Sequence, residues 1–241
     1  MDFNEGGRDP MIEARDLVKR YGDLVALDLP EFSVPRGESF GLVGNNGAGK
    51  TTFFSLILDL IEATAGEVLS NGRNVRQSEH WKGYTGSYLD ERFLIDFLTP
   101  EEYFQFIGGL HDLSREDLEN FYLRFDAFFN DEILGKAKLL RELSRGNQKK
   151  VGIAAAFLGN AEVVVLDEPF PHLDPSSVNR LKKLLSELQR ERHLTMLISS
   201  HSLNHVTDVC SRLAILEKGH IIHDMPKSED TLSVLETYFA V

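Results

Sequence analysis

The sequence contains little that is typical of secreted, membrane-spanning or nucleic-acid-binding proteins. Cys210 is the single cysteine, so a disulfide framework and a cysteine-rich metal site are both excluded. Because Cys210 follows a helical pattern over residues 203–209, we predict that it is a buried core thiol. No apolar run approaches the ~20 residues of a membrane helix. The best candidates, residues 151–158 and 163–166, are far too short.

The start of the sequence also lacks the pattern of a signal peptide. Residues 1–10 are polar and acidic, with neither a basic start nor an apolar core. We therefore expect a flexible tail over residues 1–10, a single domain over residues 11–241 and a cytoplasmic location. Met11 precedes the first strand pattern and is an alternative start to Met1. At a membrane, another polypeptide would have to supply the membrane-spanning part.

Basic charge is scarce as well. The chain has 26 Lys and Arg against 38 Asp and Glu, which gives a formal net charge of −12. Such a balance argues against the extended basic face that nucleic acid requires, although it leaves a local basic patch open. We therefore expect no nucleic-acid partner. The length of 241 residues and the apolar content of 42% suit one large α/β domain or one domain with an inserted subdomain.

What the sequence does contain is a phosphate-loop motif within SFGLVGNNGAGKTT, residues 39–52. Glycine, four residues, glycine, lysine and threonine follow an apolar strand and precede a helix expected over 50–60. Glycines let main-chain amides approach a polyphosphate, the Lys50 ammonium suits the β- and γ-phosphates, and the Thr51 hydroxyl suits Mg²⁺. A glycine-rich turn without a ligand is the disfavoured alternative. The residues predicted to bind a nucleoside triphosphate are Gly44, Asn45, Asn46, Gly47, Ala48, Gly49, Lys50, Thr51 and Thr52.

Two further apolar strands end in residues that carry chemistry. Residues 163–166 lead into Asp167 and Glu168, and residues 194–198 lead toward His201. Because the carboxyl ends of parallel strands lie at one edge of a sheet, we expect these groups to converge on the phosphate loop. Asp167 is predicted as a Mg²⁺ ligand, Glu168 as the base or orienter of water, and His201 as a partner of both phosphate and water. The alternatives are a capped surface turn and a structural histidine.

A helical insert is predicted over residues 88–143. Half of the sixteen phenylalanines fall between Phe93 and Phe129, and we expect most of them to form a core of the insert's own. Thr99 with Glu102, and Ser114 with an aspartate three residues later, indicate the starts of two helices. The other expected elements are strands over 11–19, 24–34, 213–217 and 220–223, a β excursion within 63–75 turning at Asn71-Gly72, and helices ending at 157 and over 179–192 and 231–239.

In their order, these motifs resemble the nucleotide-binding subunit of an ATP-binding cassette transporter over nearly the whole chain. Residues 44–52 match its Walker A motif and residues 163–168 its Walker B motif. Leu-Ser-Arg-Gly-Asn at 143–147 resembles the family signature Leu-Ser-Gly-Gly-Gln, Leu173-Asp174 the D-loop, and His201 the switch histidine. The resemblance implies an α/β phosphate-loop NTPase with a mainly parallel core sheet, an antiparallel β subdomain and an inserted helical subdomain.

The sequence departs from the family pattern at a few positions. In the signature, Arg145 replaces a glycine and Asn147 the glutamine, whereas Ser144 and Gly146 keep the hydroxyl and the bare amide that would face a phosphate. These changes leave the implied role of the signature in place.

Asp90 and Tyr21 also stand where the family has residues that contact the nucleotide or its metal. Asp90 stands where the Q-loop usually has glutamine, and there it would hold a magnesium-bound water. Glu91 is the competing register. Tyr21, at the turn after the first strand, resembles the aromatic residue that stacks on the nucleotide base.

The resemblance implies an ATPase that binds ATP and Mg²⁺ and acts as a dimer. Ser144, Gly146 and Asn147 would close over the ATP held by a second cassette, identical or different, with Asp174 in the D-loop beside them. Hydrolysis would energise transport by integral membrane subunits, and export is the expected direction. This chain would lie on the cytoplasmic face of the membrane, with its helical insert docked on those subunits. The alternatives are a soluble cassette ATPase acting on ribosomes or DNA, and a regulatory module that Glu168 and His201 disfavour.

Overall fold

The computed structural model describes residues 9–228 and Thr231. The tail expected over residues 1–10 lies outside the described residues except for its last two, and Pro10 already belongs to the first strand. The helix expected over 231–239 also lies outside them, apart from Thr231. Within the described ranges, none of the helices combines the length and the apolar character needed to cross a membrane.

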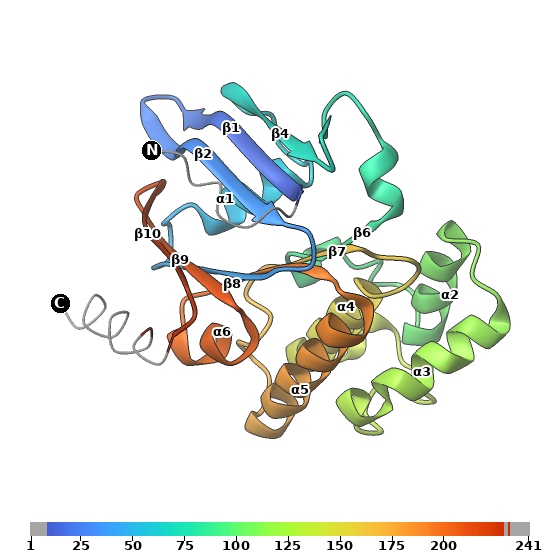
Figure 1. Cartoon of the computed structure of the whole chain (residues 1–241). Coiled ribbons are helices and arrows are strands. Elements are labelled where there is room, and N and C mark those ends of the chain that lie inside the picture. The colour runs from blue at the N-terminus through green and yellow to red at the C-terminus, as the bar shows by residue number, and fades with distance from the viewer. Residues whose placement is uncertain (1–8, 229–230, 232–241) are drawn as a thin grey trace.

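A six-stranded sheet forms the centre of the molecule (Figure 1). Its order is β10-β9-β3-β8-β7-β6, and all neighbours are parallel except β9 and β10. The prediction of a mainly parallel sheet is confirmed. β3 and β7 are buried over their whole length, which explains their apolar sequences. The strands are β3 (Ser39–Val43), β6 (Thr85–Tyr88), β7 (Val163–Leu166), β8 (Thr195–Ser200), β9 (Arg212–Glu217) and β10 (His220–Pro226).

A smaller antiparallel sheet of order β2-β1-β4-β5 lies over one face of the central sheet, together with helix α1 (Figure 1). Asn71 and Gly72 join β4 to β5 with φ values of 49° and 71°. Both angles are positive, as a type I′ turn requires, so the turn predicted from these two residues is confirmed. The elements of this layer are β1 (Pro10–Tyr21), β2 (Leu24–Pro35), α1 (Lys50–Ile57), β4 (Ala65–Ser70) and β5 (Arg73–Asn74).

Helices α2 to α6 lie on the other side of the central sheet, where α2 packs on α3 and α4, and α3 packs on α4 and α5 (Figure 1). Two of them start with the predicted capping boxes: Thr99 and Glu102 exchange hydrogen bonds at the start of α2, and Ser114 and Asp117 do so at the start of α3. The helices are α2 (Pro100–Leu110), α3 (Arg115–Phe129), α4 (Arg145–Ala155), α5 (Pro175–Arg192) and α6 (Leu203–Val209). Three short 3-10 helices, His80–Gly83, Glu91–Phe93 and Leu140–Glu142, lie in the connections.

Side chains along the central strands point alternately to the two faces of the sheet, which divides the apolar core into two clusters, one on each face. In β7, Val163 and Val165 belong to the cluster beneath the antiparallel sheet, whereas Val164 and Leu166 belong to the cluster beneath the helices. The single tryptophan, Trp81, lies in the first cluster, where its indole N–H donates to the carbonyl of Val75 at 2.8 Å. Each face of the sheet is therefore sealed from water.

The phenylalanines of the helical insert do not form a core of their own. Phe93, Phe97 and Phe106 are exposed, and the other five in this stretch are buried. The buried rings belong to the same cluster as the central strands, and Phe125 contacts Phe157 after α4 with ring centroids 5.9 Å apart. The expectation of a separate core is wrong because the insert packs directly on α4 and α5.

Several element boundaries differ from the sequence-based expectations. Helix α5 starts at Pro175 rather than residue 179, because Asp174 caps it and proline suits the first helical position. Strand β6 was not expected, because its sequence Thr-Gly-Ser-Tyr is polar and only Tyr88 is buried. Cys210 is buried as predicted, and burial raises the pKa of its thiol.

Candidate active site

The phosphate loop joins β3 to α1 and takes a shape that only glycine permits at two of its positions. A Cβ atom on Gly44 would lie 2.4 Å from the carbonyl oxygen of Leu216. Gly49 has a φ of 112°, and a Cβ atom there would lie 2.6 Å from the carbonyl oxygen of Ala26. The spacing of the motif therefore has a steric cause, namely the close approach of β2 and β9 to the loop.

A cavity of about 320 Å³ opens on this loop. Its lining is formed by residues 46–52, by residues 24–26 at the start of β2, by Glu168, and by Lys218 in the turn between β9 and β10. Tyr21 lies at the end of β1, 52% exposed, with the Lys19 ammonium 4.8 Å from the centre of its ring. The structure thus places residues 24–26 at the cavity wall and leaves Tyr21 outside the lining.

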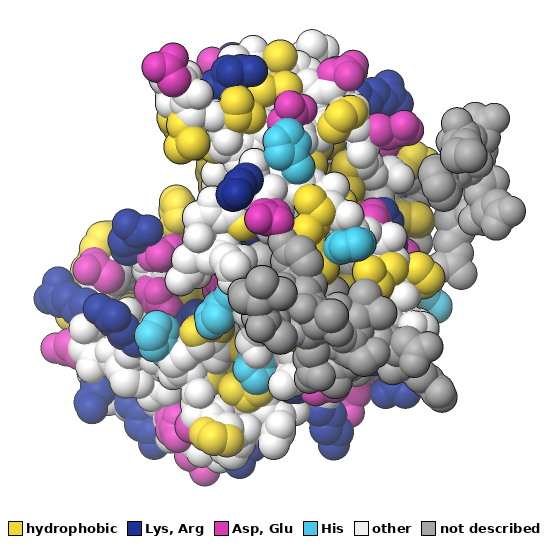
Figure 2. Space-filling view, turned by 90° about the vertical axis from the view of Figure 1, so that its left-hand side faces the viewer, with side chains coloured by type: hydrophobic (Ala, Val, Ile, Leu, Met, Phe, Trp, Pro, Cys, Tyr) yellow, Lys and Arg dark blue, Asp and Glu magenta, His cyan; other side chains and the backbone are white. Residues whose placement is uncertain are grey.

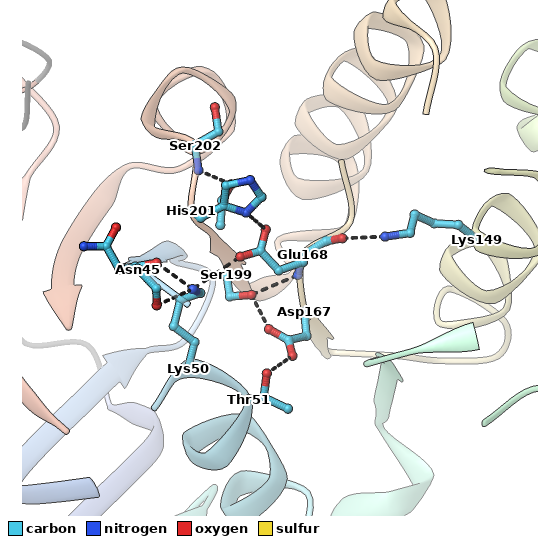
Figure 3. A network of polar contacts seen from close by, with 11 residues as sticks. Asn45, Lys50, Thr51, Lys149, Asp167, Glu168, Ser199, His201 and Ser202 are labelled. Atoms are coloured by element: carbon cyan, nitrogen blue, oxygen red, sulfur yellow. Dashed lines mark hydrogen bonds and ion pairs between the residues drawn. The ribbon is translucent and has the colours of Figure 1, made fainter. Parts of the chain in front are cut away.

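Lys50 is buried at the base of the cavity, with 6% of its surface exposed. Its ammonium donates to the carbonyl oxygens of Gly44 at 2.6 Å and Asn45 at 3.3 Å. It also lies 3.3 Å from Oε1 of Glu168, in an ion pair without hydrogen-bond geometry. Figure 3 shows the lysine reaching across the loop toward this carboxylate. The fold therefore brings a cation and a carboxylate from distant parts of the chain to the place where phosphate would bind.

Asp167 follows β7 and is held by hydroxyl groups on both of its carboxylate oxygens. Oδ2 accepts a hydrogen bond from Thr51 in α1, and Oδ1 accepts one from Ser199 in β8. Burial raises the pKa of Asp167, while these two hydrogen bonds act against that shift. Ser199 was not singled out from the sequence, and its position at the end of a predicted strand was the only signal available.

The Thr51 hydroxyl and the Asp167 carboxylate form a donor set that fits Mg²⁺. They are hard oxygen ligands in direct contact, and Thr51 lines the cavity. Mg²⁺ is usually bound by one or two carboxylates together with substrate phosphates. No group of three or more His, Cys, Asp and Glu side chains with metal-binding geometry occurs among the described residues. The site therefore suits a cation that shares its coordination with a nucleotide better than a closed protein cage.

Glu168 carries its carboxylate into the same space. Its Oε2 lies 2.9 Å from Nδ1 of His201, which comes from the end of β8, and its Oε1 faces Lys50. Its main chain is held by Ser199, whose Oγ accepts from the Glu168 N–H at 2.9 Å, and by Lys149, whose ammonium donates to the Glu168 carbonyl at 2.8 Å. The structure thus brings together five predicted residues, namely Lys50, Thr51, Asp167, Glu168 and His201 (Figure 3).

The two candidates for the Q-loop carboxylate have different surroundings. Asp90 caps the short helix Glu91–Phe93. Its carboxylate accepts hydrogen bonds from the main-chain N–H of Arg92 at 2.8 Å and from the Arg92 guanidinium at 2.8 and 3.1 Å. These hydrogen bonds lower the pKa of Asp90. Glu91 instead accepts from the Tyr88 hydroxyl at 2.8 Å and lies 3.8 Å from the Lys149 ammonium. Of the two, Glu91 has the closer connection to Glu168.

The signature residues lie away from the phosphate-loop cavity, at the start of α4. The Ser144 hydroxyl caps this helix by accepting from the Asn147 N–H at 3.3 Å. A Cβ atom on Gly146 would lie 2.8 Å from the carbonyl oxygen of His172, so the loop before α5 packs closely on the signature. Arg145 lines a separate groove of about 730 Å³ together with Asp90 and His172.

Asp174, the predicted D-loop residue, is turned into its own helix. Its carboxylate caps α5 by accepting hydrogen bonds from the main-chain N–H groups and the hydroxyls of Ser176 and Ser177. Bonds from these two serines lower the pKa of Asp174 well below its usual range. Within this chain its carboxylate therefore acts as a helix cap.

Three features define a phosphate-loop nucleoside triphosphatase: a glycine loop around a buried lysine after β3, a carboxylate pair at the end of β7, and a histidine after β8, the strand that lies between β3 and β7. The model of the ABC transporter family matches residues 27–171. The chain belongs to this family and is one of its ATP-binding cassette ATPases.

Individual relatives agree with this assignment. An uncharacterized ABC transporter ATP-binding protein of Methanocaldococcus jannaschii is 35% identical over 216 residues, covering 89% of this chain and 77% of that protein. The bacitracin transport ATP-binding protein BcrA of Enterococcus faecalis is 31% identical over 225 residues, covering 91% and 70%. A solved structure of the ATP-binding subunit of an ABC transporter has a TM-score of 0.81 at 27% identity, covering 95% of this chain and 93% of that one.

Proposed function

We propose that this chain energises export by integral membrane subunits, and that it hydrolyses ATP between two cassettes arranged head to tail. One observation carries the dimer: the start of α4 at Ser144 and Gly146 is a helix end that favours anions, yet it lies apart from the cavity of its own phosphate loop. The nucleotide that Ser144, Gly146 and Asn147 contact then belongs to the second cassette, identical or different.

In this proposal, the side chains around the cavity divide the chemistry among themselves. Lys50 holds the β- and γ-phosphates, Glu168 orients the attacking water and accepts its proton, and His201 keeps the Glu168 carboxylate in place through the 2.9 Å contact. Thr51 and Asp167 hold Mg²⁺, which neutralises charge on the phosphates when it is bound. A bound phosphate competes with Glu168 for Lys50, and this competition frees the carboxylate for water.

The helical insert is proposed to dock on the membrane subunits at the cytoplasmic face. Phe93 and Phe97, at the entrance to the insert, are 64% and 63% exposed, and the 730 Å³ groove lies beside them at Asp90, Arg92 and Leu94. Exposed aromatic rings beside a groove are typical of a protein interface. The relative named for bacitracin transport supports transport as the process. On the face drawn in Figure 2, Lys and Arg side chains lie among Asp and Glu side chains.

Replacing Glu168 by Gln tests the catalytic part of the proposal. The amide keeps the size of the side chain but cannot take a proton, so we expect hydrolysis to fall by at least about a hundredfold. We also expect Glu168→Gln to form a stable dimer with ATP and Mg²⁺, measured as a doubled mass by size-exclusion chromatography with light scattering. Adding Lys50→Met to Glu168→Gln should abolish that dimer. An undiminished rate in Glu168→Gln would disprove the role of Glu168.

Isolating the chain from its native membranes tests the transport part. We expect an integral membrane protein to co-purify in constant ratio, and the exposed ring substitutions Phe93→Ser and Phe97→Ser to release it without changing hydrolysis by the free chain. Leu123→Ser, on a residue of α3 that is 76% exposed, is the matched control. Recovery of ribosomes or DNA in place of a membrane protein would refute transport and favour a soluble cassette ATPase.

A further inference from the structure

Glu168 has a backbone conformation that its surroundings must maintain. Its φ of 45° lies in the left-handed region, which is unfavourable for residues with a side chain, and the following residue is Pro169, which restricts it further. Such conformations persist where neighbouring groups hold them, and they are found at functional sites. The direction of the Glu168 carboxylate toward Lys50 and His201 depends on this geometry.

Two hydrogen bonds hold the main chain of Glu168 from opposite sides. Ser199 accepts from its N–H at 2.9 Å, and the Lys149 ammonium donates to its carbonyl oxygen at 2.8 Å. Lys149 lies on α4 and is 5% exposed. A charged donor in a buried place forms a stronger hydrogen bond than a neutral one. In Figure 3, Lys149 reaches Glu168 from the side opposite to Lys50.

Lys149 is in turn held by residues at the entrance to the helical insert. Oε1 of Glu91 lies 3.8 Å from its ammonium, and the Tyr88 ring centre lies 5.5 Å from it. The Tyr88 hydroxyl donates to the same Glu91 oxygen at 2.8 Å. A buried ammonium requires such partners, because burial without compensating charge is unfavourable. Tyr88 also accepts from the Asp167 N–H at 2.8 Å, so the chain of contacts closes on the site.

We infer that Lys149 is a positioning residue for Glu168 and that Glu91 keeps Lys149 in place. This inference rests on the proposed role of Glu168 as the base. Because Lys149 lies on the signature helix and Glu91 lies at the entrance to the insert, a displacement of either segment changes the support of the Glu168 carbonyl. The direction of the Glu168 carboxylate, which orients water, then depends on the positions of the signature and of the insert, because Lys149 holds the Glu168 main chain.

Lys149→Met in the full chain tests the inference, and Lys150→Met is its matched control. Lys150 is the next residue on α4, is also buried, and pairs with Glu132 at 2.8 Å rather than with Glu168. We expect Lys149→Met to lower kcat by about a hundredfold, the effect of a misplaced catalytic group, while the KM for ATP and the Kd for a fluorescent ATP analogue stay near their wild-type values. Lys150→Met should keep most of the wild-type kcat, and Lys149→Arg should recover part of what Lys149→Met loses.

Thermal unfolding of each variant separates positioning from general stability. Equal losses of kcat in Lys149→Met and Lys150→Met, or a loss of ATP binding as large as the loss of kcat, would overturn the inference. If Lys149→Met does not fold, Glu91→Gln carries the same test and the same expected split between kcat and KM. An inactive Glu168→Gln beside a fully active Lys149→Met refutes the inference alone, whereas an active Glu168→Gln refutes the proposed base and the inference together.

Discussion

At the scale of single residues, the adjacent carboxylates Asp167 and Glu168 have opposite environments. Asp167 is 4% exposed, and each of its carboxylate oxygens accepts a hydrogen bond from a hydroxyl group. Burial raises the pKa of its carboxyl. Glu168 faces a cation and a histidine and keeps 24% of its side chain exposed. A pair of acids separated in this way can serve two purposes, one as a ligand to a cation and the other toward water.

Ser199 contacts both acids, so its removal should affect the site more than its size suggests. Ser199→Ala removes one hydrogen bond to Asp167 and the acceptor of the Glu168 N–H. Since buried groups that lose their partner cost about 1–3 kcal/mol each, we expect a lower free energy of unfolding in urea and a lower kcat. Ser200→Ala is the control, because the Ser200 hydroxyl is equally buried but accepts from Ser202. Equal kcat values in the two variants would contradict this role of Ser199.

At the scale of elements, the contact between β6 and α4 has no room for a side chain. A Cβ atom on Gly86 would lie 1.8 Å from the carbonyl oxygen of Ala156, directly after α4. Strand β6 ends in Tyr88, whose carbonyl oxygen accepts a hydrogen bond from the Asp167 N–H, and α4 begins in the signature. Strand β6, which leads into the insert, is therefore packed closely against α4, the helix that follows the insert.

Gly86→Ala should force β6 and α4 apart and destabilise the protein by several kcal/mol, as changes that conflict with rigid backbone do. Gly109→Ala in α2 provides the contrast, because nothing lies within 4 Å of a Cβ atom there. A helical alanine in open space should stabilise the protein by about 0.5–1 kcal/mol. Differential scanning calorimetry measures both changes, and a Gly86→Ala protein as stable as wild type would contradict the contact.

The elements also show where sequence patterns were informative. The spacing of Gly44 and Gly49, the apolar run before Asp167, and the caps at Thr99 and Ser114 depend on local chemistry, so they were predictable. Other features depend on contacts between distant segments, which no local pattern contains: β6 is polar, Ser199 and Lys149 act across the sheet edge, and the insert shares its core. Asp90 was assigned to a metal-bound water from its position, but its carboxylate binds Arg92 two residues away.

At the scale of the whole molecule, the insert and the central sheet share one apolar cluster. Phe125 lies at the junction, 2% exposed, with its ring against Phe121, Phe129 and Phe157. An insert that shares its core with the sheet should not unfold separately, so we expect a single cooperative transition for the described fold.

Phe125→Ala should therefore lower the stability of the whole chain, by about 3–5 kcal/mol for a buried ring. Calorimetry and far-ultraviolet circular dichroism should report the same midpoint in the wild type and the same shift in the variant. Leu123→Ala, on the exposed side of α3, should leave the midpoint nearly unchanged. Two separate transitions, with only the first sensitive to Phe125→Ala, would show that the insert unfolds independently.

The burial of the single tryptophan makes this chain its own optical probe. Trp81 is buried in the apolar cluster that joins the antiparallel sheet to the central sheet, on the face opposite to the insert, and its indole N–H donates to the carbonyl of Val75. Its emission should therefore be blue-shifted in the native state and should move to longer wavelength when the sheets separate. A rearrangement confined to the insert would leave this fluorescence unchanged, so intrinsic emission can distinguish a motion of the insert from an opening of the two sheets without any added label.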